Sequence, residues 1–249
     1  MYTVDQIVQT FSPDSSGFIG IAVAFAIANA IGLLEYIWAC RLAVREKRTP
    51  FPVWMHSFMF AHDLTAGIVF AFLAVQYNFF WLFTIYAAGM LAWTCMEIFN
   101  LSMSVKYEAE ETWGAGTSTQ SAIANTVLQA MVMIAFVNIM RYLMNDTAMF
   151  HWLPMTNFVM AVAPGYILLK RQSRQGSSVM LYIFIVIGTA FNFAPAGIGL
   201  FTTAMPWVYD NPIWYAVGAV CLIVAVWNLV KIIKMPAKPQ ATGEKKPIW

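Results

Sequence analysis

The chain has 249 residues, of which 60% are hydrophobic and only 10% are charged. Soluble domains carry about 25% charged residues, so this composition excludes a water-soluble globular protein and indicates a chain that crosses a membrane several times. The formal net charge of +2 is small and is spread over the loops, so we expect no binding to nucleic acid.

Seven apolar runs follow one another along the chain, each near the roughly 20 residues that a helix needs to cross a bilayer. The segment before the first run is polar, and that run is long enough to remain as a span instead of being cleaved as a signal peptide. The expected spans are residues 18–40, 54–75, 79–102, 120–142, 150–169, 178–203 and 212–234. The sequence therefore predicts an all-α polytopic membrane protein, a bundle of seven transmembrane helices.

Basic residues predict the orientation of this bundle. With seven spans, 13 of the 14 Lys and Arg residues fall in connections on the same side as the C-terminus, and only Arg141 falls opposite. The positive-inside rule then places the N-terminus outside and the C-terminus in the cytoplasm. We expect one membrane domain over residues 1–235, a polar and disordered cytoplasmic tail over residues 236–249, and a location in a bacterial inner membrane or an endomembrane.

Acidic residues interrupt three successive spans: Glu35 in the first, Asp63 in the second and Glu97 in the third. An ionisable group at membrane depth costs roughly 2.5–3.5 kcal/mol on insertion scales, and it indicates a functional site by default. Two histidines of the second span, His56 and His62, lie at similar depths. Such groups avoid lipid by facing one another, so we expect a cavity with a polar floor that opens toward the cytoplasmic half.

Helical spacing groups these acids with aromatic residues. Trp93, Glu97 and Asn100 are four and then three residues apart, which places them on one stripe of the third span, and Trp38 follows Glu35 by three. Aromatic rings beside a carboxyl group exclude water, which favours the protonated acid, and their faces stabilise cations. This pattern is typical of acid chemistry on an apolar substrate.

Structural roles are the alternative for each acid. Glu35 could pair with Arg41 near the interface, and Asp63 with His62 could form a buried ion pair that joins helices. Glu97, in the best formed stripe, is the acid for which a functional role is favoured most.

The sequence lacks the motifs that usually bind metals or cofactors. The chain has three histidines and none is spaced as a paired metal ligand on one span, while its three cysteines show no CxxC motif. Lys231 lies at the end of the last span, whereas a retinal protein needs its lysine near the middle. Glycine-rich phosphate loops and Ser-His-Asp constellations are also missing from the sequence. We therefore expect neither metal nor cofactor.

Two short motifs resemble a known family. The third span contains "AWTCMEIFN", and residues 170–184 read "KRQSRQGSSVMLYIF". Together with the length and the seven-span layout, they are similar to the small membrane terpene cyclases of fungal meroterpenoid and indole-diterpene pathways and their bacterial relatives. The resemblance places Glu97 at the position of the family's proton donor and matches Arg174, Gly176 and Ser177 to its loop before the sixth span. It implies cyclisation of an isoprenoid, started by protonation without a metal.

The last span departs from the family, which has an aspartate there, because Asn228 is the only polar residue at depth in this span. Asp63, supported by His62, or Glu35 is then expected to supply the second acid beside Glu97. The remaining candidates are expected to line the substrate cavity: His62, Trp93, Trp38, Asn100, Asn228 and Trp227.

Two other functions would also account for the buried acids and the apolar helices. The first alternative is a proton-coupled transporter of a lipophilic or cationic solute, favoured by the helix-breaking "FNFAPAGIGLFTTAMPW" after the sixth span. The second is a non-catalytic subunit of a membrane complex, in which the acidic segment 107–111 would be a docking surface. The expected partners are a hydrophobic small molecule and membrane lipid, with a homo-oligomer or an unknown complex partner left open.

Overall fold

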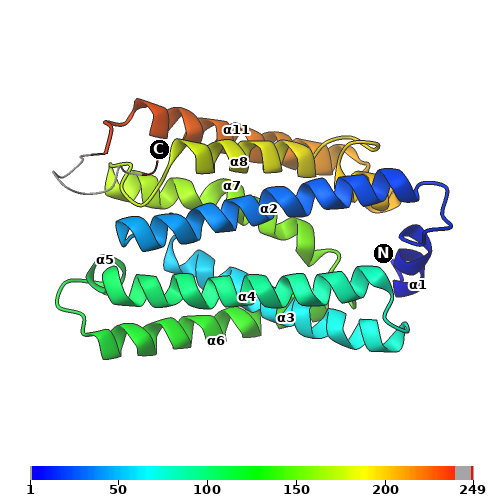
Figure 1. The fold of residues 1–249 in the computed structure, drawn as a ribbon, viewed down its shortest axis with the longest axis horizontal. Helices are drawn as coiled ribbons and strands as arrows, with labels where there is room; N and C mark the ends of the chain where they lie inside the picture. The colour runs from blue at the N-terminus through cyan, green and yellow to red at the C-terminus, as the bar shows by residue number, and fades with distance from the viewer. Residues whose placement is uncertain (1, 239–247, 249) are drawn as a thin grey trace.

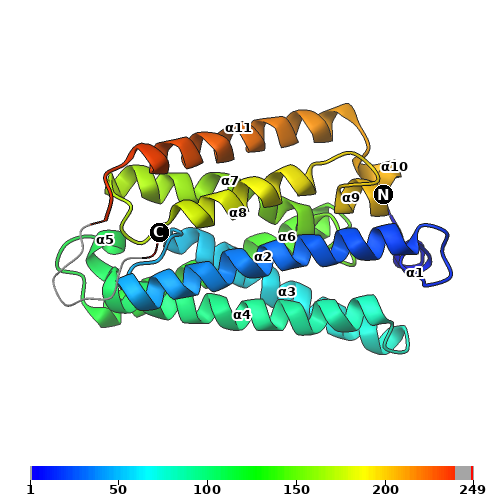
Figure 2. The same cartoon turned by 45° about the horizontal axis from the view of Figure 1, so that its top comes forward.

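A computed structural model describes residues 2–238 and 248 of the chain. Within these residues every regular element is a helix. The long helices run side by side along the longest axis (Figure 1): α2 (Phe18–Glu46), α3 (Val53–Gln76), α4 (Trp81–Tyr107), α6 (Thr119–Leu143), α7 (Trp152–Arg171), α8 (Val179–Asn192) and α11 (Pro212–Lys234). At one end of the bundle lie α1 (Val4–Thr10), α9 (Leu200–Ala204) and α10 (Pro206–Tyr209), and at the other end lies α5 (Ala109–Trp113), as Figure 2 shows.

Six of the described helices are long and apolar enough to cross a membrane. This confirms the all-helical, membrane-spanning class, whereas the number of seven spans and the orientation of the termini stay predictions. The difference lies in the expected span 178–203, because α8 ends at Asn192 after 14 residues. Pro195 has no N–H for a helical hydrogen bond and disfavours helix in the residue before it, so the chain continues irregularly to α9.

Helix α3 is the most buried of the six long apolar helices. In α3, 61% of the most apolar window is buried, against 17% in the peripheral α6. Helix α3 packs on α4 and α6, while α8 packs between α2 and α11. Gly67 permits the close approach of α3 to α4, because a Cβ there would lie 3.0 Å from Leu91 Cδ2. A core helix of this kind can carry polar side chains only where partners or a cavity receive them.

The acidic segment at α5 is paired within the chain. Arg171, at the end of α7, pairs with Glu108 and also with Glu111, at 2.7 Å from its Nε. Arg48 pairs with Glu111 as well, and the backbone N–H of Thr49 donates to Glu108 at 3.0 Å. These contacts link the α2–α3 connection, the segment after α4 and the end of α7, so the acids form stabilising ion pairs within the chain.

The N-terminal segment covers the opposite end of the bundle. The Tyr2 hydroxyl bonds to the carboxylate of Asp146 and accepts the backbone N–H groups of Ala148, at 3.0 Å, and Phe150, at 3.2 Å. Burial and the charge of Asp146 raise the pKa of the Tyr2 phenol, so this hydroxyl stays a hydrogen-bond donor at neutral pH. The segment is thereby fixed to the loop before α7.

The expected disordered tail, residues 236–249, falls mainly on residues 239–247 and 249, which lie outside the described residues. In the part that the structure describes, Lys238 pairs with Glu46 at 2.5 Å, and Ile248 is buried.

Candidate active site

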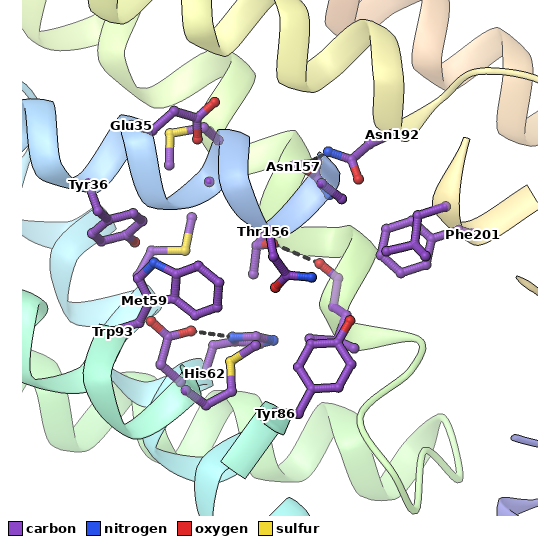
Figure 3. Close-up of a pocket in the computed structure, with 18 residues that line it drawn as sticks. Glu35, Tyr36, Met59, His62, Tyr86, Trp93, Thr156, Asn157, Asn192 and Phe201 are labelled. Carbon is purple, nitrogen blue, oxygen red and sulfur yellow. Dashed lines mark hydrogen bonds and ion pairs between the residues drawn. The ribbon is translucent and has the colours of Figure 1, made fainter. Parts of the chain in front are cut away.

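A cavity lies in the middle of the bundle between α2, α3, α4 and α7, and the segment from the end of α8 to α9 forms part of its wall. It contains about 690 Å³ of empty space, its open mouth included. Figure 3 shows Glu35 and His62 on opposite sides of this space, with Phe201 to one side. Its polar lining residues are Asn29, Glu35, Tyr36, His62, Asp63, Tyr86, Trp93, Thr156, Asn157 and Asn192.

Glu35 is the unpaired acid of the cavity. Its side chain comes from α2 and is buried, with 6% of the residue exposed. Among the described residues its carboxyl group has no hydrogen-bond or ion-pair partner. Gly188 of α8 leaves it space, because a Cβ at that glycine would lie 2.9 Å from Glu35 Oε1. A buried carboxyl group without a partner is stable chiefly as the neutral acid, which is a proton donor.

Asp63 and His62 form a pair on the other side of the cavity. Oδ1 of Asp63 lies 2.8 Å from Nδ1 of His62, and both residues line the cavity. The second ring nitrogen of His62, Nε2, is buried without a hydrogen-bond partner among the described residues. A carboxylate that holds one imidazole nitrogen leaves the other free to exchange a proton.

Glu97 lies behind the cavity wall and is fully buried. Its Oε1 accepts the hydroxyl of Tyr36 at 2.5 Å, and its Oε2 lies 2.5 Å from Nδ1 of His56. Tyr36 is itself a lining residue, whereas Glu97 and His56 are not among the lining residues. The acid that the sequence favoured most thus reaches the cavity only through the Tyr36 hydroxyl.

The other sequence candidates are distributed over the bundle. Trp93 lines the cavity, but the Trp38 indole donates to Ser178 at 2.9 Å in the contact between α2 and α8. Asn100 is buried, with its Nδ2 3.7 Å from the sulfur of Cys40. Trp38 and Asn100 therefore form contacts between helices outside the cavity.

The candidates of the last helix lie away from the cavity. Asn228 donates to the backbone oxygen of Ala161 at 3.2 Å, where α11 packs on α7. Trp227 is 58% exposed, and Lys231 lies 4.8 Å above its ring. Neither is a lining residue.

Several cavity residues were not among the sequence candidates. Asn192 donates to Asn157 at 2.9 Å, and Thr156 and Asn29 lie along the same cavity. Their signal in the sequence was weak, because amides and hydroxyls at membrane depth are far less costly than charges. The position of Tyr36, directly after Glu35, was the clearest available indication.

The arrangement combines acid–base groups with an aromatic enclosure. Tyr36, Tyr86, Trp93 and Phe201 surround the space between Glu35 and the Asp63 pair. Ring faces attract a positive charge within about 6 Å of their centroids, by roughly 0.5–2 kcal/mol each. The cavity can therefore donate a proton, stabilise a cation and accept a proton.

Among the described residues no three His, Cys, Asp or Glu side chains converge as a set of metal ligands.

No known protein family, characterised protein or solved structure matches the chain significantly. The similarity to membrane terpene cyclases, drawn from two short motifs, stays a hypothesis.

Proposed function

We propose that the protein is an integral membrane enzyme that starts the cyclisation or isomerisation of an isoprenoid, or a similarly lipophilic substrate, by donating a proton from a buried carboxyl group. The observation that carries the proposal is the cavity itself. It presents an unpaired acid, Glu35, opposite a carboxylate–imidazole pair, Asp63 and His62, inside an aromatic enclosure. Two carboxyl groups in different environments are the usual arrangement for separate acid and base roles.

Glu35 is the proton donor in this proposal, in place of Glu97. A general acid must come within hydrogen-bond reach of the atom that it protonates. Glu35 lines the cavity, whereas the carboxyl oxygens of Glu97 are taken up by Tyr36 and His56. Glu97 is a positioning residue that fixes the Tyr36 hydroxyl at the cavity wall.

The proposed reaction conserves protons and needs no oxidant. Glu35 transfers its proton either to an alkene carbon, where the π electron pair forms the new C–H bond, or to an epoxide oxygen, which keeps the electron pair of the breaking C–O bond. In both cases the carbon that loses the electron pair becomes a carbocation. The aromatic rings of Trp93 and Tyr86 stabilise this cation while it rearranges. The Asp63–His62 pair then removes a proton from a neighbouring carbon, which forms the new alkene. The Asp63–His62 pair releases that proton to solvent, and Glu35 takes up another proton from solvent before the next cycle.

Amide substitutions test these roles. We expect Glu35→Gln to lower product formation by about 10²–10⁴-fold, which is the usual contribution of general acid catalysis. Asp63→Asn should give a similar loss. Asp14→Asn, in an exposed loop, is the matched control and should keep wild-type activity. The variants are expressed in a membrane host supplied with farnesylated and epoxidised isoprenoids, and products are measured by mass spectrometry at equal protein levels. Full activity of Glu35→Gln would contradict the assignment.

One observation favours a second function, a proton-coupled carrier of a lipophilic or cationic solute. The irregular segment after α8 borders the cavity, since Asn192 and Phe201 on its two sides are lining residues. Broken helices next to a binding site are typical of transporters. An enzyme converts its substrate in detergent, whereas a carrier moves an unchanged solute and needs sealed vesicles.

We further propose that α8 and the segment after it complete a seventh crossing, with the N-terminus outside and the C-terminus in the cytoplasm. Support comes from the side-by-side packing of α8 with α2 and α11 and from the placement of 13 of the 14 Lys and Arg residues on the C-terminal side of a seven-span layout. Reporter fusions to each terminus test the orientation. Reporters that place both termini on the same side would contradict it.

A further inference from the structure

A second hollow, a groove between α2 and α4, adjoins the cavity. It contains about 740 Å³ of empty space, its open side included, and its lining is almost wholly apolar. Two of its residues, Leu33 and Ile85, are 45% and 51% exposed, so the groove opens on the outer surface of the bundle. In a membrane-spanning bundle this surface faces lipid. The residues that line only the groove are Phe25, Ala30, Leu33, Ile85, Ala92 and Met96, together with Gly89.

The groove and the cavity share part of their walls. Asn29, Tyr86 and Trp93 line both. The indole of Trp93 lies between two glycines, because a Cβ at Gly32 would be 3.6 Å from it and a Cβ at Gly89 would be 3.8 Å from it. The partition between the apolar groove and the polar cavity is therefore a few side chains thick, with Trp93 at its centre.

The Trp93 side chain has an unsatisfied hydrogen-bond donor at this boundary. Its indole N–H is buried and has no hydrogen-bond partner among the described residues. Buried N–H groups are nearly always paired, and an unpaired one at a cavity wall indicates a place for an acceptor on a ligand. An apolar molecule with one polar or reactive end would match both the groove and this donor.

We propose that the groove between α2 and α4 binds the apolar chain of the substrate, which enters sideways from the bilayer and places its reactive end in the cavity beyond Trp93. The occupant is an isoprenoid chain, and for this identity the inference rests on the proposed function. Three observations support it: the groove is apolar, it opens on the lipid-facing surface, and it is continuous with the acid-lined cavity through shared residues.

Photolabelling locates the chain directly. The wild-type protein in nanodiscs of phosphatidylcholine is irradiated with farnesol that carries a diazirine on its terminal isoprene unit, and adducts are mapped by mass spectrometry. We expect adducts on Leu33, Ile85 and Met96 that excess unlabelled farnesol abolishes. Adducts spread over the outer faces of α6 and α11, or groove adducts that farnesol does not displace, would overturn the proposal, because the groove would then hold bulk lipid.

Groove-filling variants give a second readout. Gly89→Leu and Ala92→Leu should each lower the displaceable labelling roughly tenfold, since the added side chain would occupy space that the bound chain needs and steric costs of this kind are typically of this order. Gly20→Leu is the matched control, because nothing lies within 4 Å of a Cβ at that position of α2. Unchanged labelling in both groove variants would overturn the proposal.

Product formation, measured in the same samples, separates this inference from the proposed function. Displaceable groove labelling without product from any isoprenoid tested would contradict the enzyme while supporting the groove. Product without groove labelling would contradict the groove alone.

Discussion

Removing the Glu97 side chain should destabilise the bundle strongly, because three helices meet at its carboxyl group. Tyr36 of α2 and His56 of α3 both bond to Glu97 of α4, and His56 and Glu97 are fully buried. In Glu97→Ala both partners lose their hydrogen bonds. Each unsatisfied buried group costs about 1–3 kcal/mol, and breaking a buried ionisable pair costs about 3–5 kcal/mol. We expect the free energy of unfolding to fall by about 3–5 kcal/mol.

Glu97→Gln removes the ionisable group but can keep both hydrogen bonds, so it tests the two contributions separately. The glutamine carbonyl can accept the Tyr36 hydroxyl, and its amide can donate to a neutral His56 nitrogen, so we expect a loss below about 1.5 kcal/mol. Unfolding is followed in mixed micelles by titration with a denaturing detergent, using tryptophan fluorescence. Ile98→Ala, beside Glu97 but 53% exposed, is the control. The reasoning would be refuted if Glu97→Ala were as stable as this control, or if Glu97→Gln were as unstable as Glu97→Ala.

Three further substitutions, and one control, test other parts of the structure with the same unfolding assay. Arg171→Ala leaves the buried carboxylate of Glu108 without its cation, while the partly exposed Glu111 keeps Arg48, and it should cost about 3–5 kcal/mol. A loss similar to that of an exposed substitution would contradict a structural role for these ion pairs. A Cβ at Gly165 would lie 2.3 Å from Oδ1 of Asn228, so Gly165→Ala should cost about 1–3 kcal/mol. Gly20→Ala meets no atom and should be neutral or stabilising; equal effects of these two alanines would count against the packing of α7 on α11. Tyr2→Phe removes a hydroxyl with three buried partners and should cost about 1–3 kcal/mol; wild-type stability would show that the N-terminal segment is not fixed by this group.

Much of the fold could be predicted from the sequence because the membrane imposes length and composition on each helix. Six expected spans agree with the observed helices to within about six residues at each end. The exception, residues 178–203, is as apolar as the others, but hydropathy alone does not register the break at Pro195. Helix ends such as those of α2 and α4 continue beyond the apolar runs, since solvated turns need no hydrophobic residues.

The candidate site could be predicted only in part, because periodicity gives the face of a helix but not its rotation toward each neighbour. Their expected depth in the membrane grouped Glu35, Asp63 and His62 with Glu97 and His56, and the structure places the first three along one cavity. It could not show that Glu97 of α4 bonds to Tyr36 of α2 and His56 of α3 behind the cavity wall, because spacing along one helix does not determine which neighbouring helix a side chain faces. The polar partners that complete the cavity come from distant spans, and no sequence spacing connects them.

Solvent isotope incorporation tests the central claim, that a protein carboxyl group donates a proton to the substrate, most directly. The purified protein is equilibrated in D₂O buffer, given the isoprenoid substrate that yields product, and the product and the remaining substrate are analysed by mass spectrometry. Our account predicts product that contains deuterium from solvent, recovered substrate that contains none, and loss of this labelled product in Glu35→Gln. Product without deuterium, or labelled product formed at the wild-type rate by Glu35→Gln, would contradict it.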